Sequence, residues 1–315
     1  MTYIERKEEL LKKQIIPQTK EADFEKFWQE QVAKIRRIPI KIERRELDLP
    51  YKTFKVYEIK YNTHDDTTVT GYLSVPCTYS GKKIPCAAIY HGGGGAFGIF
   101  PAYVATGVCT FSIDNRSQGG KTYDRAQYDV LDDYNRGNAI MSHGLLDKEN
   151  FYMRNIYLDA VRAIDVIAML PEVDAERIVA HGQSQGGALT IVASALSGKV
   201  KKAYPSVPSY SCLEKRVENA SGVFGAVNAY LKDHPEKTDT VLKTLSYFDV
   251  NNMVSLLKIP TEFFLGLADP TCLPAFVYSL YAHTESEKNI VFGPFTPHTI
   301  SSEYRYKLLG EFAAL

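Results

Sequence analysis

The stretch "ERIVAHGQSQGGAL", residues 176–189, decides the fold that we expect for this chain. Residues 177–181 are mostly apolar, which favours a strand, and "GGALTIVASALS" favours a helix. Between them, Gly182, Ser184 and Gly186 form the pattern G-x-S-x-G. Between a strand and a helix, this pattern is typical of a nucleophilic serine lifted clear of a sheet on a strained turn.

Two features of the turn fit this interpretation. The residues two positions before and after the serine must be small, because side chains there would clash, and both are glycine. The N-terminus of the following helix points at the serine and favours developing negative charge. The alternative is a Gly/Ser-rich turn that leads into a structural helix.

A nucleophilic serine needs a base, which in this architecture lies in a loop near the end of the chain. Three histidines follow Ser184. His234 lies in the polar stretch "KDHPEK", and His283 lies near the end of a predicted helix. Only His298 follows a predicted strand, at 288–293, so we predict that it is the base, although it could instead cap the last helix.

The base needs an orienting carboxylate, which should lie between the serine and the histidine in the chain. In "IPTEFFLGLADPTCLP" a predicted strand at 261–267 is followed by Asp269 in a loop bounded by proline. Its rival is Asp249 in "YFDV", and an ordinary Asp-Pro turn is the structural alternative. We predict that Asp269 is the acid.

The rest of the chain predicts an α/β-hydrolase fold, with a mostly parallel central sheet and helices on both faces. Short apolar runs at 84–90, 107–113, 177–181, 261–267 and 288–293 alternate with helical patterns at 152–169, 186–197, 273–283 and 302–314. Before them come a helix at 22–36 and a hairpin of strands, "FKVYEIKYN" and "TVTGYLSVPC".

The domain organisation expected is a single domain over 1–315, because no Pro/Gly/Ser-rich linker divides the chain. Residues 1–50 are expected to form an N-terminal helical extension. Residues 198–258, which have the weakest patterns, are expected to form an excursion over the active-site side after the nucleophile helix.

Composition excludes several classes of protein. Lys plus Arg and Asp plus Glu both number 37, so there is no basic footprint for nucleic acid. No apolar run approaches the roughly 18 residues that span a bilayer, so no membrane partner is expected. The five scattered cysteines, together with an N-terminus that does not resemble a signal peptide, predict free thiols and a cytoplasmic location. No cluster has metal-ligand spacing, so no metal is predicted.

A second glycine-rich stretch suggests different chemistry. "HGGGGAFG", residues 91–98, fits the dinucleotide pattern G-x-G-x-x-G, and Asp114 follows where a ribose-binding carboxylate is expected. A dinucleotide loop opens into a regular helix, whereas these glycines lead into "IFPAYVATG", which contains a proline. We therefore expect no cofactor, and we expect the loop to offer backbone N–H groups to a transient oxyanion.

Longer segments resemble a known family. They are "DFEKFWQEQVAKI", "DNRSQGG" at 114–120, the whole of 142–187, and "YFDVNNMVSLLKIPTEFFLGLADPTCLP". Together they resemble the acetyl xylan esterase/cephalosporin C deacetylase family (carbohydrate esterase family 7) over nearly the whole chain. The resemblance implies a triad of Ser184, Asp269 and His298, in agreement with the argument from chain order.

The resemblance also implies further site residues and an assembly. The oxyanion hole would be the backbone N–H groups of Gln185 and Gly93, and Arg116 and Gln118 would support the site structurally. Family members are typically cytoplasmic, need no metal, and form hexameric rings. Three positions depart from the family: Thr299 replaces a glutamate, Ser117 replaces a glycine, and Gly93 replaces a tyrosine that would wall the pocket.

The function expected is removal of acetyl groups from small acetylated sugars such as xylo-oligosaccharides, and from cephalosporin C. The alternatives are another α/β-hydrolase activity, either a general carboxylesterase or a peptidase, a nucleotide-binding oxidoreductase, and a catalytically silent interaction protein on the same scaffold.

Overall fold

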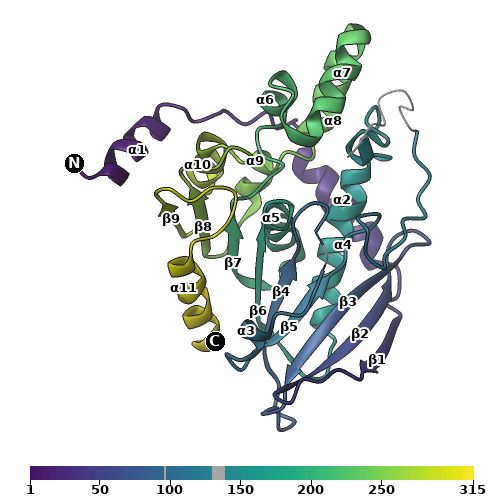
Figure 1. The fold of residues 1–315 in the computed structure, drawn as a ribbon. Coiled ribbons are helices and arrows are strands. Elements are labelled where there is room, and N and C mark those ends of the chain that lie inside the picture. Colours follow the sequence, from purple (N-terminus) through teal and green to yellow (C-terminus); the bar gives the residue numbers. More distant parts are fainter. Residues whose placement is uncertain (96, 130–138) are drawn as a thin grey trace.

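The strands of the computed structural model, which describes residues 1–95, 97–129 and 139–315, form one sheet in the order β1-β2-β3-β5-β4-β6-β7-β8-β9 (Figure 1). The pairs β1–β2, β2–β3 and β3–β5 are antiparallel, and the other neighbours are parallel. The strands are β1 (Ile42–Leu47), β2 (Phe54–Asn62), β3 (Thr68–Pro76), β4 (Ile84–Tyr90), β5 (Cys109–Ile113), β6 (Val173–Gln183), β7 (Val200–Ser206), β8 (Thr261–Gly266) and β9 (Lys288–Gly293).

The mostly parallel sheet and the β2–β3 hairpin confirm the predicted α/β-hydrolase fold. β1 was not predicted, and the N-terminal extension is therefore not wholly helical. Its sequence, "IERREL", is largely exposed along its length, so it lacks the apolar alternation by which a half-buried strand is recognised.

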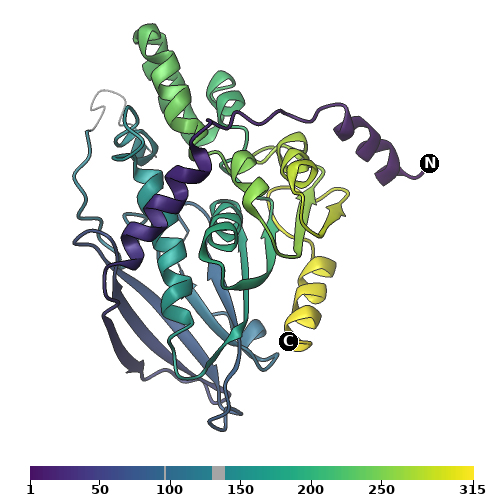
Figure 2. The same ribbon diagram turned by 180° about the vertical axis from the view of Figure 1, so that it is seen from behind.

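Alternating residues of β4 show how the two faces of the sheet are covered. Cys86, Ala88 and Tyr90 belong to the larger hydrophobic cluster, whereas Ala87 and Ile89 belong to a second cluster. The first face carries α2 (Phe24–Arg36), α4 (Tyr152–Ile167), α5 (Gln185–Ser197) and α10 (Pro274–His283), and the second carries α3 (Pro101–Val104) and α11 (Ser302–Ala313). Figure 2 shows α2 lying along α4 on the first face.

Segment 198–258 differs from the expectation at its start. Residues 200–206 form β7 inside the sheet, so the excursion begins only after Ser206. The strand reads "VKKAYPS", and its two lysines and proline conceal the apolar run expected of a buried parallel strand.

The excursion itself is mainly helical. It comprises α6 (Leu213–Glu218), η3 (Gly222–Phe224), α7 (Gly225–Asp233), η4 (Pro235–Lys237), α8 (Thr238–Ser246), α9 (Val250–Met253) and η5 (Val254–Leu256). α7 and α8 project beyond the end of the sheet in Figure 1, while α1 (Tyr3–Lys12) extends to one side and contacts α10. η2 (Ala139–Ser142) precedes α4.

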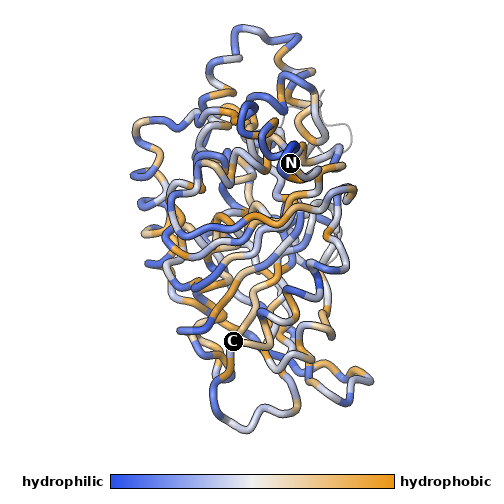
Figure 3. The backbone as a smooth tube through the Cα atoms, turned by 90° about the vertical axis from the view of Figure 1, so that its left-hand side faces the viewer, coloured by the Kyte–Doolittle hydropathy of each residue, from blue (hydrophilic) through white to orange (hydrophobic). Residues whose placement is uncertain are grey.

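Hydropathy follows this layering. Figure 3 shows hydrophobic segments along the strands in the interior and hydrophilic segments in the outer loops. All five cysteines are free thiols, as predicted. In the described ranges, every helix is too short or too polar to cross a bilayer.

Candidate active site

Ser184 lies on a strained turn between β6 and α5. Its backbone has φ 56° and ψ −121°, a conformation that side-chain-bearing residues rarely adopt. A Cβ on Gly182 would lie 2.5 Å from the backbone of Gly186, and a Cβ on Gly186 would overlap the carbonyl oxygen of Tyr90. These contacts require glycine at both positions, as the sequence predicted.

Neighbouring backbone holds the turn in place. The Ser184 N–H donates to the carbonyl of Ser206 at 3.1 Å, and the Ser209 N–H donates to the carbonyl of Ser184 at 3.0 Å. The serine is thereby tied to the end of β7 and to the first residues of the excursion.

His298 and Asp269 form the expected pair at the ends of β9 and β8. His298 Nδ1 lies 2.8 Å from Asp269 Oδ2, and the Asp269 side chain is buried. Asp269 Oδ1 accepts from the N–H groups of Thr271 and Cys272 at 2.8 and 2.9 Å, which fixes the carboxylate. The hydrogen bond to Asp269 raises the pKa of His298 above its usual range, and it leaves Nε2 to exchange a proton with a substrate or nucleophile.

The rival residues make other contacts. Asp249 caps α9 through Asn251 N–H and also accepts from the N–H groups of Cys212 and Leu213 at 2.9 and 2.7 Å. His283 Nε2 lies 2.8 Å from the carbonyl of Ile16. Both residues therefore hold chain segments together, and Asp269 is the carboxylate that contacts His298.

The loop after β4 lies against the turn that carries Ser184. A Cβ built on Gly92 would lie 3.8 Å from Ser184 Cβ, and one on Gly93 would lie 3.7 Å from Gln185 Oε1. Gln185 begins α5, so its N–H has no partner within that helix. The backbone amides of Gly93 and Gln185 thus come from two adjacent segments beside the serine.

Gln118 links these two segments. Its side chain and that of Gln185 exchange hydrogen bonds at 2.9 and 2.8 Å, and the Gly94 N–H donates to Gln118 Oε1 at 3.3 Å. The Tyr210 hydroxyl donates to Gln185 Oε1 at 2.5 Å. Tyr210 was not predicted, because nothing in the local pattern marks a residue of the excursion as a partner of the turn.

Arg116 is fully buried among three carboxylates. It donates to both oxygens of Asp159 at 2.6 and 2.8 Å, and to Asp65 and Asp124 at 2.7 and 2.9 Å. These contacts raise the pKa of Arg116, and the guanidinium lowers the pKa of Asp65 to about 2. The Tyr152 hydroxyl donates to the Arg116 carbonyl at 2.7 Å, so Arg116 anchors the loop that carries Gln118.

The dinucleotide alternative fails on local geometry. The helix after the glycines, α3, has only four residues. Asp114 Oδ2 accepts from the N–H groups of Lys121 and Thr122 at 2.6 Å each. This carboxylate oxygen therefore holds the loop of residues 114–122 together.

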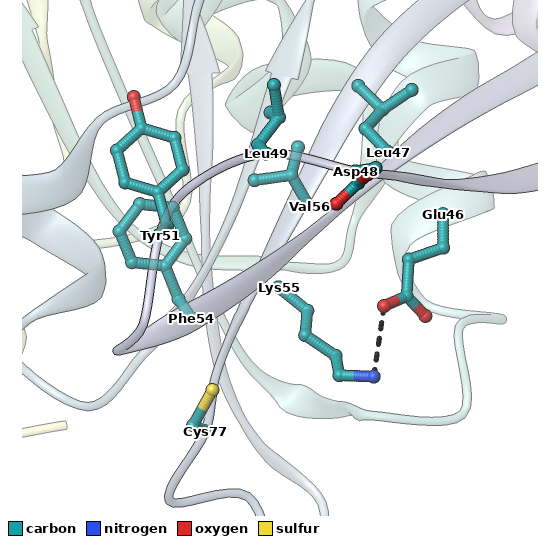
Figure 4. A pocket seen from close by; sticks show the side chains of 9 residues that line it. All are labelled: Glu46, Leu47, Asp48, Leu49, Tyr51, Phe54, Lys55, Val56 and Cys77. Atoms are coloured by element: carbon teal, nitrogen blue, oxygen red, sulfur yellow. Dashed lines mark ion pairs between the residues drawn. The ribbon is translucent and has the colours of Figure 1, made fainter.

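Two cavities meet at Ser184 and His298. One, of about 670 Å³, is lined by Gly93, Ser184, Gln185 and His298 together with residues of the excursion. The other, of about 410 Å³, lies between α3 and the ends of β4 and β6 and also contains Ser184 and His298. A third cavity, of about 420 Å³, lies beside Tyr51, Phe54 and Cys77 and contains none of the predicted site residues (Figure 4).

Cys272 joins the Asp–His pair, which the sequence did not reveal. Ligand atoms of Asp269, Cys272 and His298 all lie within 4.8 Å of one another. The three residues come from two loops that are far apart in the chain, so spacing alone could not show the cluster. Cys272 also contributes to the raised pKa of His298.

Comparison with known proteins identifies the relatives of this arrangement. The family described as acetyl xylan esterase (AXE1) matches residues 1–314. The chain belongs to the acetyl xylan esterase family. It is therefore an acetyl esterase of the serine hydrolase type, and the family resemblance seen in the sequence is confirmed.

Two relatives cover almost the whole chain. Acetyl esterase Axe7A of Xylanibacter ruminicola is 28% identical over 307 residues, which are 95% of this chain and 67% of that protein. The structure of an acetyl xylan esterase from Paenibacillus sp. R4 is 30% identical, with a TM-score of 0.88 over 96% of this chain and 98% of that one.

The fold alone extends further than the acetyl xylan esterase family. The acylaminoacyl peptidase of Pyrococcus horikoshii superposes with a TM-score of 0.59 over 83% of this chain and 41% of that one, at 19% identity.

Proposed function

We propose that this chain removes acetyl groups from acetylated small sugars, such as xylo-oligosaccharides, through an acetyl-enzyme formed on Ser184. One observation carries the proposal. His298, which lies 2.8 Å from Asp269, lines the same cavity as Ser184, Gly93 and Gln185. A base, a nucleophile and two backbone donors are the groups that acyl transfer requires.

Acylation begins with Ser184 and His298. His298 Nε2 takes the proton of the Ser184 hydroxyl as Oγ attacks the acetyl carbonyl carbon, and Asp269 stabilises the imidazolium that forms. The N–H groups of Gly93 and Gln185 donate to the oxyanion, and each such donor is worth about 10²–10³ in rate. His298 then gives its proton to the departing sugar oxygen as the carbon–oxygen bond breaks.

Deacylation repeats these steps with water. His298 removes a proton from water, the hydroxide attacks the acetyl-serine carbonyl, and the same two N–H groups receive the charge. Collapse of the intermediate returns the proton to Ser184 Oγ and releases acetate. Cephalosporin C, which is also an acetyl ester, is proposed as a second substrate on the family resemblance.

Acetate release tests the proposal directly. The assay compares acetylated xylobiose, an acetylated monosaccharide and a peptide amide, with Ser184→Ala as the matched variant. We expect release of acetate from both sugars, no cleavage of the amide, and a loss of about 10⁴-fold or more in the variant. Undiminished turnover in the Ser184→Ala variant, or a preference for the amide, contradicts the proposal.

Assembly and location are the final part of the proposal. By family resemblance we propose a cytoplasmic homohexamer, and the five free thiols suit a reducing compartment. Native mass spectrometry checks the assembly, and a monomer at micromolar concentration counts against it.

A further inference from the structure

The larger cavity at Ser184 has an unbalanced charge. Among the described residues that line it, Arg216 supplies a permanent positive charge, His298 is the other basic group, and none is aspartate or glutamate. A cavity with this balance attracts negative charge.

Arg216 is held rigidly but incompletely paired. Its side chain is buried, with 4% exposed, and it stacks on Phe276 at 5.1 Å from the ring centre. Nε donates to the Ser211 carbonyl at 2.8 Å and Nη1 donates to the Thr271 carbonyl at 3.0 Å. Nη2 is buried and has no hydrogen-bond partner, which is unusual for a guanidinium nitrogen.

Asp249, which interacts electrostatically with Arg216, does not complete the pairing of this guanidinium. Asp249 accepts hydrogen bonds from the N–H groups of Cys212, Leu213 and Asn251 at 2.7–2.9 Å, and these contacts fix both of its oxygens. Nη2 therefore stays without a partner on a residue that lines the cavity.

A second donor without a partner belongs to the same cavity lining. Ser209 also lines the cavity, and its buried Oγ has no partner. Its N–H donates to the carbonyl of Ser184 at 3.0 Å, which places this serine next to the nucleophile. Two unpartnered buried donors from one segment thus border the site where an ester is expected to react.

We propose that Arg216 and Ser209 form a binding site for a carboxylate on the alcohol part of the substrate, close to the acetyl ester. Nη2 of Arg216 and the Ser209 hydroxyl each donate to the carboxylate, which gives both unpaired groups a partner. The enzyme then prefers acetylated sugar acids over neutral acetylated sugars. This inference rests on the proposed function, because it assumes that an acetyl ester occupies the cavity.

The test is a matched pair of substrates: fully acetylated glucuronic acid, and its methyl ester, which has the same skeleton without the charge. For the wild-type protein we expect kcat/KM for acetate release to favour the acid by about tenfold to a hundredfold, the range for hydrogen bonds to a charged group. High salt should reduce this preference, since a charge interaction carries it.

Variants assign the preference to its residues. Arg216→Met should bring the ratio of the two kcat/KM values to about one, and Arg216→Lys should keep part of it, because lysine keeps the charge without the planar fork. Ser209→Ala should lower the ratio, while Ser211→Ala should not, because Ser211 is equally buried and unpartnered but does not line the cavity. A purely structural role of Arg216 changes both rates and leaves the ratio intact.

The outcomes separate this inference from the proposed function. Equal turnover of the two esters by the wild-type protein, or a preserved ratio in Arg216→Met, overturns the carboxylate site. If Arg216→Met does not fold, the wild-type ratio and the comparison of Ser209→Ala with Ser211→Ala decide whether the carboxylate site exists. Failure to deacetylate even acetylated xylobiose instead overturns the proposed function.

Discussion

Two glycine-rich loops lie side by side in this molecule and have opposite construction. One follows β4 at residues 92–95, and the other, residues 182–187, spans the end of β6 and the start of α5. The two strands pair so that Tyr90 lies opposite Gly182. The β6 loop continues into α5, a buried helix of 13 residues, whereas the β4 loop leads to α3, of four residues. A long helix with its N-terminus at the turn favours negative charge at Ser184.

The glycines of the two loops also differ in how much space surrounds them. At Gly182, Gly186 and Gly187 an added Cβ would collide with backbone atoms, so close packing requires them. At Gly93 the same atom would make ordinary contacts, starting at 3.7 Å. A glycine pattern in a sequence therefore does not distinguish a packed turn from an open loop that offers its amides.

The largest effect is expected from a change that impairs the catalysis proposed for the β6 loop. Asp269→Asn should reduce kcat by about 10⁴-fold, since His298 then loses its oriented tautomer. Because Asp269 raises the pKa of His298 and the base acts when neutral, the acid limb of the kcat/KM profile should also move to lower pH. Rate profiles against pH measure both effects.

Asp249→Asn is the matched control for Asp269→Asn. It should lower the free energy of unfolding, because an amide cannot accept all three backbone N–H groups that now contact Asp249. The acid limb of its kcat/KM profile should stay at the wild-type pH. A shift equal to that of Asp269→Asn would indicate that Asp249, and not Asp269, orients the base.

The next largest effect is on the free energy of unfolding, measured for one glycine substitution in each loop. Gly186→Ala should lower the free energy of unfolding by about 3 kcal/mol, since its Cβ would overlap the Tyr90 carbonyl. Gly93→Ala should change it by less than about 1 kcal/mol, because its surroundings leave room. Urea denaturation measures both, and equal losses would remove the distinction between a packed and an open loop.

The smallest effect concerns the link between the loops. Gln118→Ala removes the two hydrogen bonds to the Gln185 amide and the contact to Gly94. The proposed oxyanion donors, the N–H groups of Gly93 and Gln185, then lose their mutual alignment. We expect kcat to fall by about tenfold to a hundredfold with little change in KM. A rise in KM alone, with kcat preserved, would place Gln118 in substrate binding instead.

Much of this arrangement could be predicted from the sequence, where local pattern and chain order are sufficient. The β6–α5 turn combines a strand, a glycine pattern and an apolar helix, and Asp269 and His298 follow strands in the expected order. The pairing of His298 with Asp269 then follows from strands β8 and β9 lying side by side.

What could not be predicted depends on contacts across the chain. Strand β7 was missed because its lysines and proline hide it, and β1 because it is exposed. The partners of Arg116 come from three separate segments, and Tyr210 reaches Gln185 from the excursion. Such contacts leave no periodic signal, because they are fixed only when the sheet brings distant loops together.

The measurement that tests the central claim most directly is covalent labelling of the nucleophile. A phosphonate ester that mimics the tetrahedral intermediate is incubated with the protein, and intact-mass and peptide mass spectrometry locate the adduct. We predict one adduct per chain, on Ser184, formed much more slowly in Asp269→Asn and absent in Ser184→Ala. An adduct on another residue, or equal labelling of the Ser184→Ala variant, would contradict the assignment of the β6 loop as the site of catalysis.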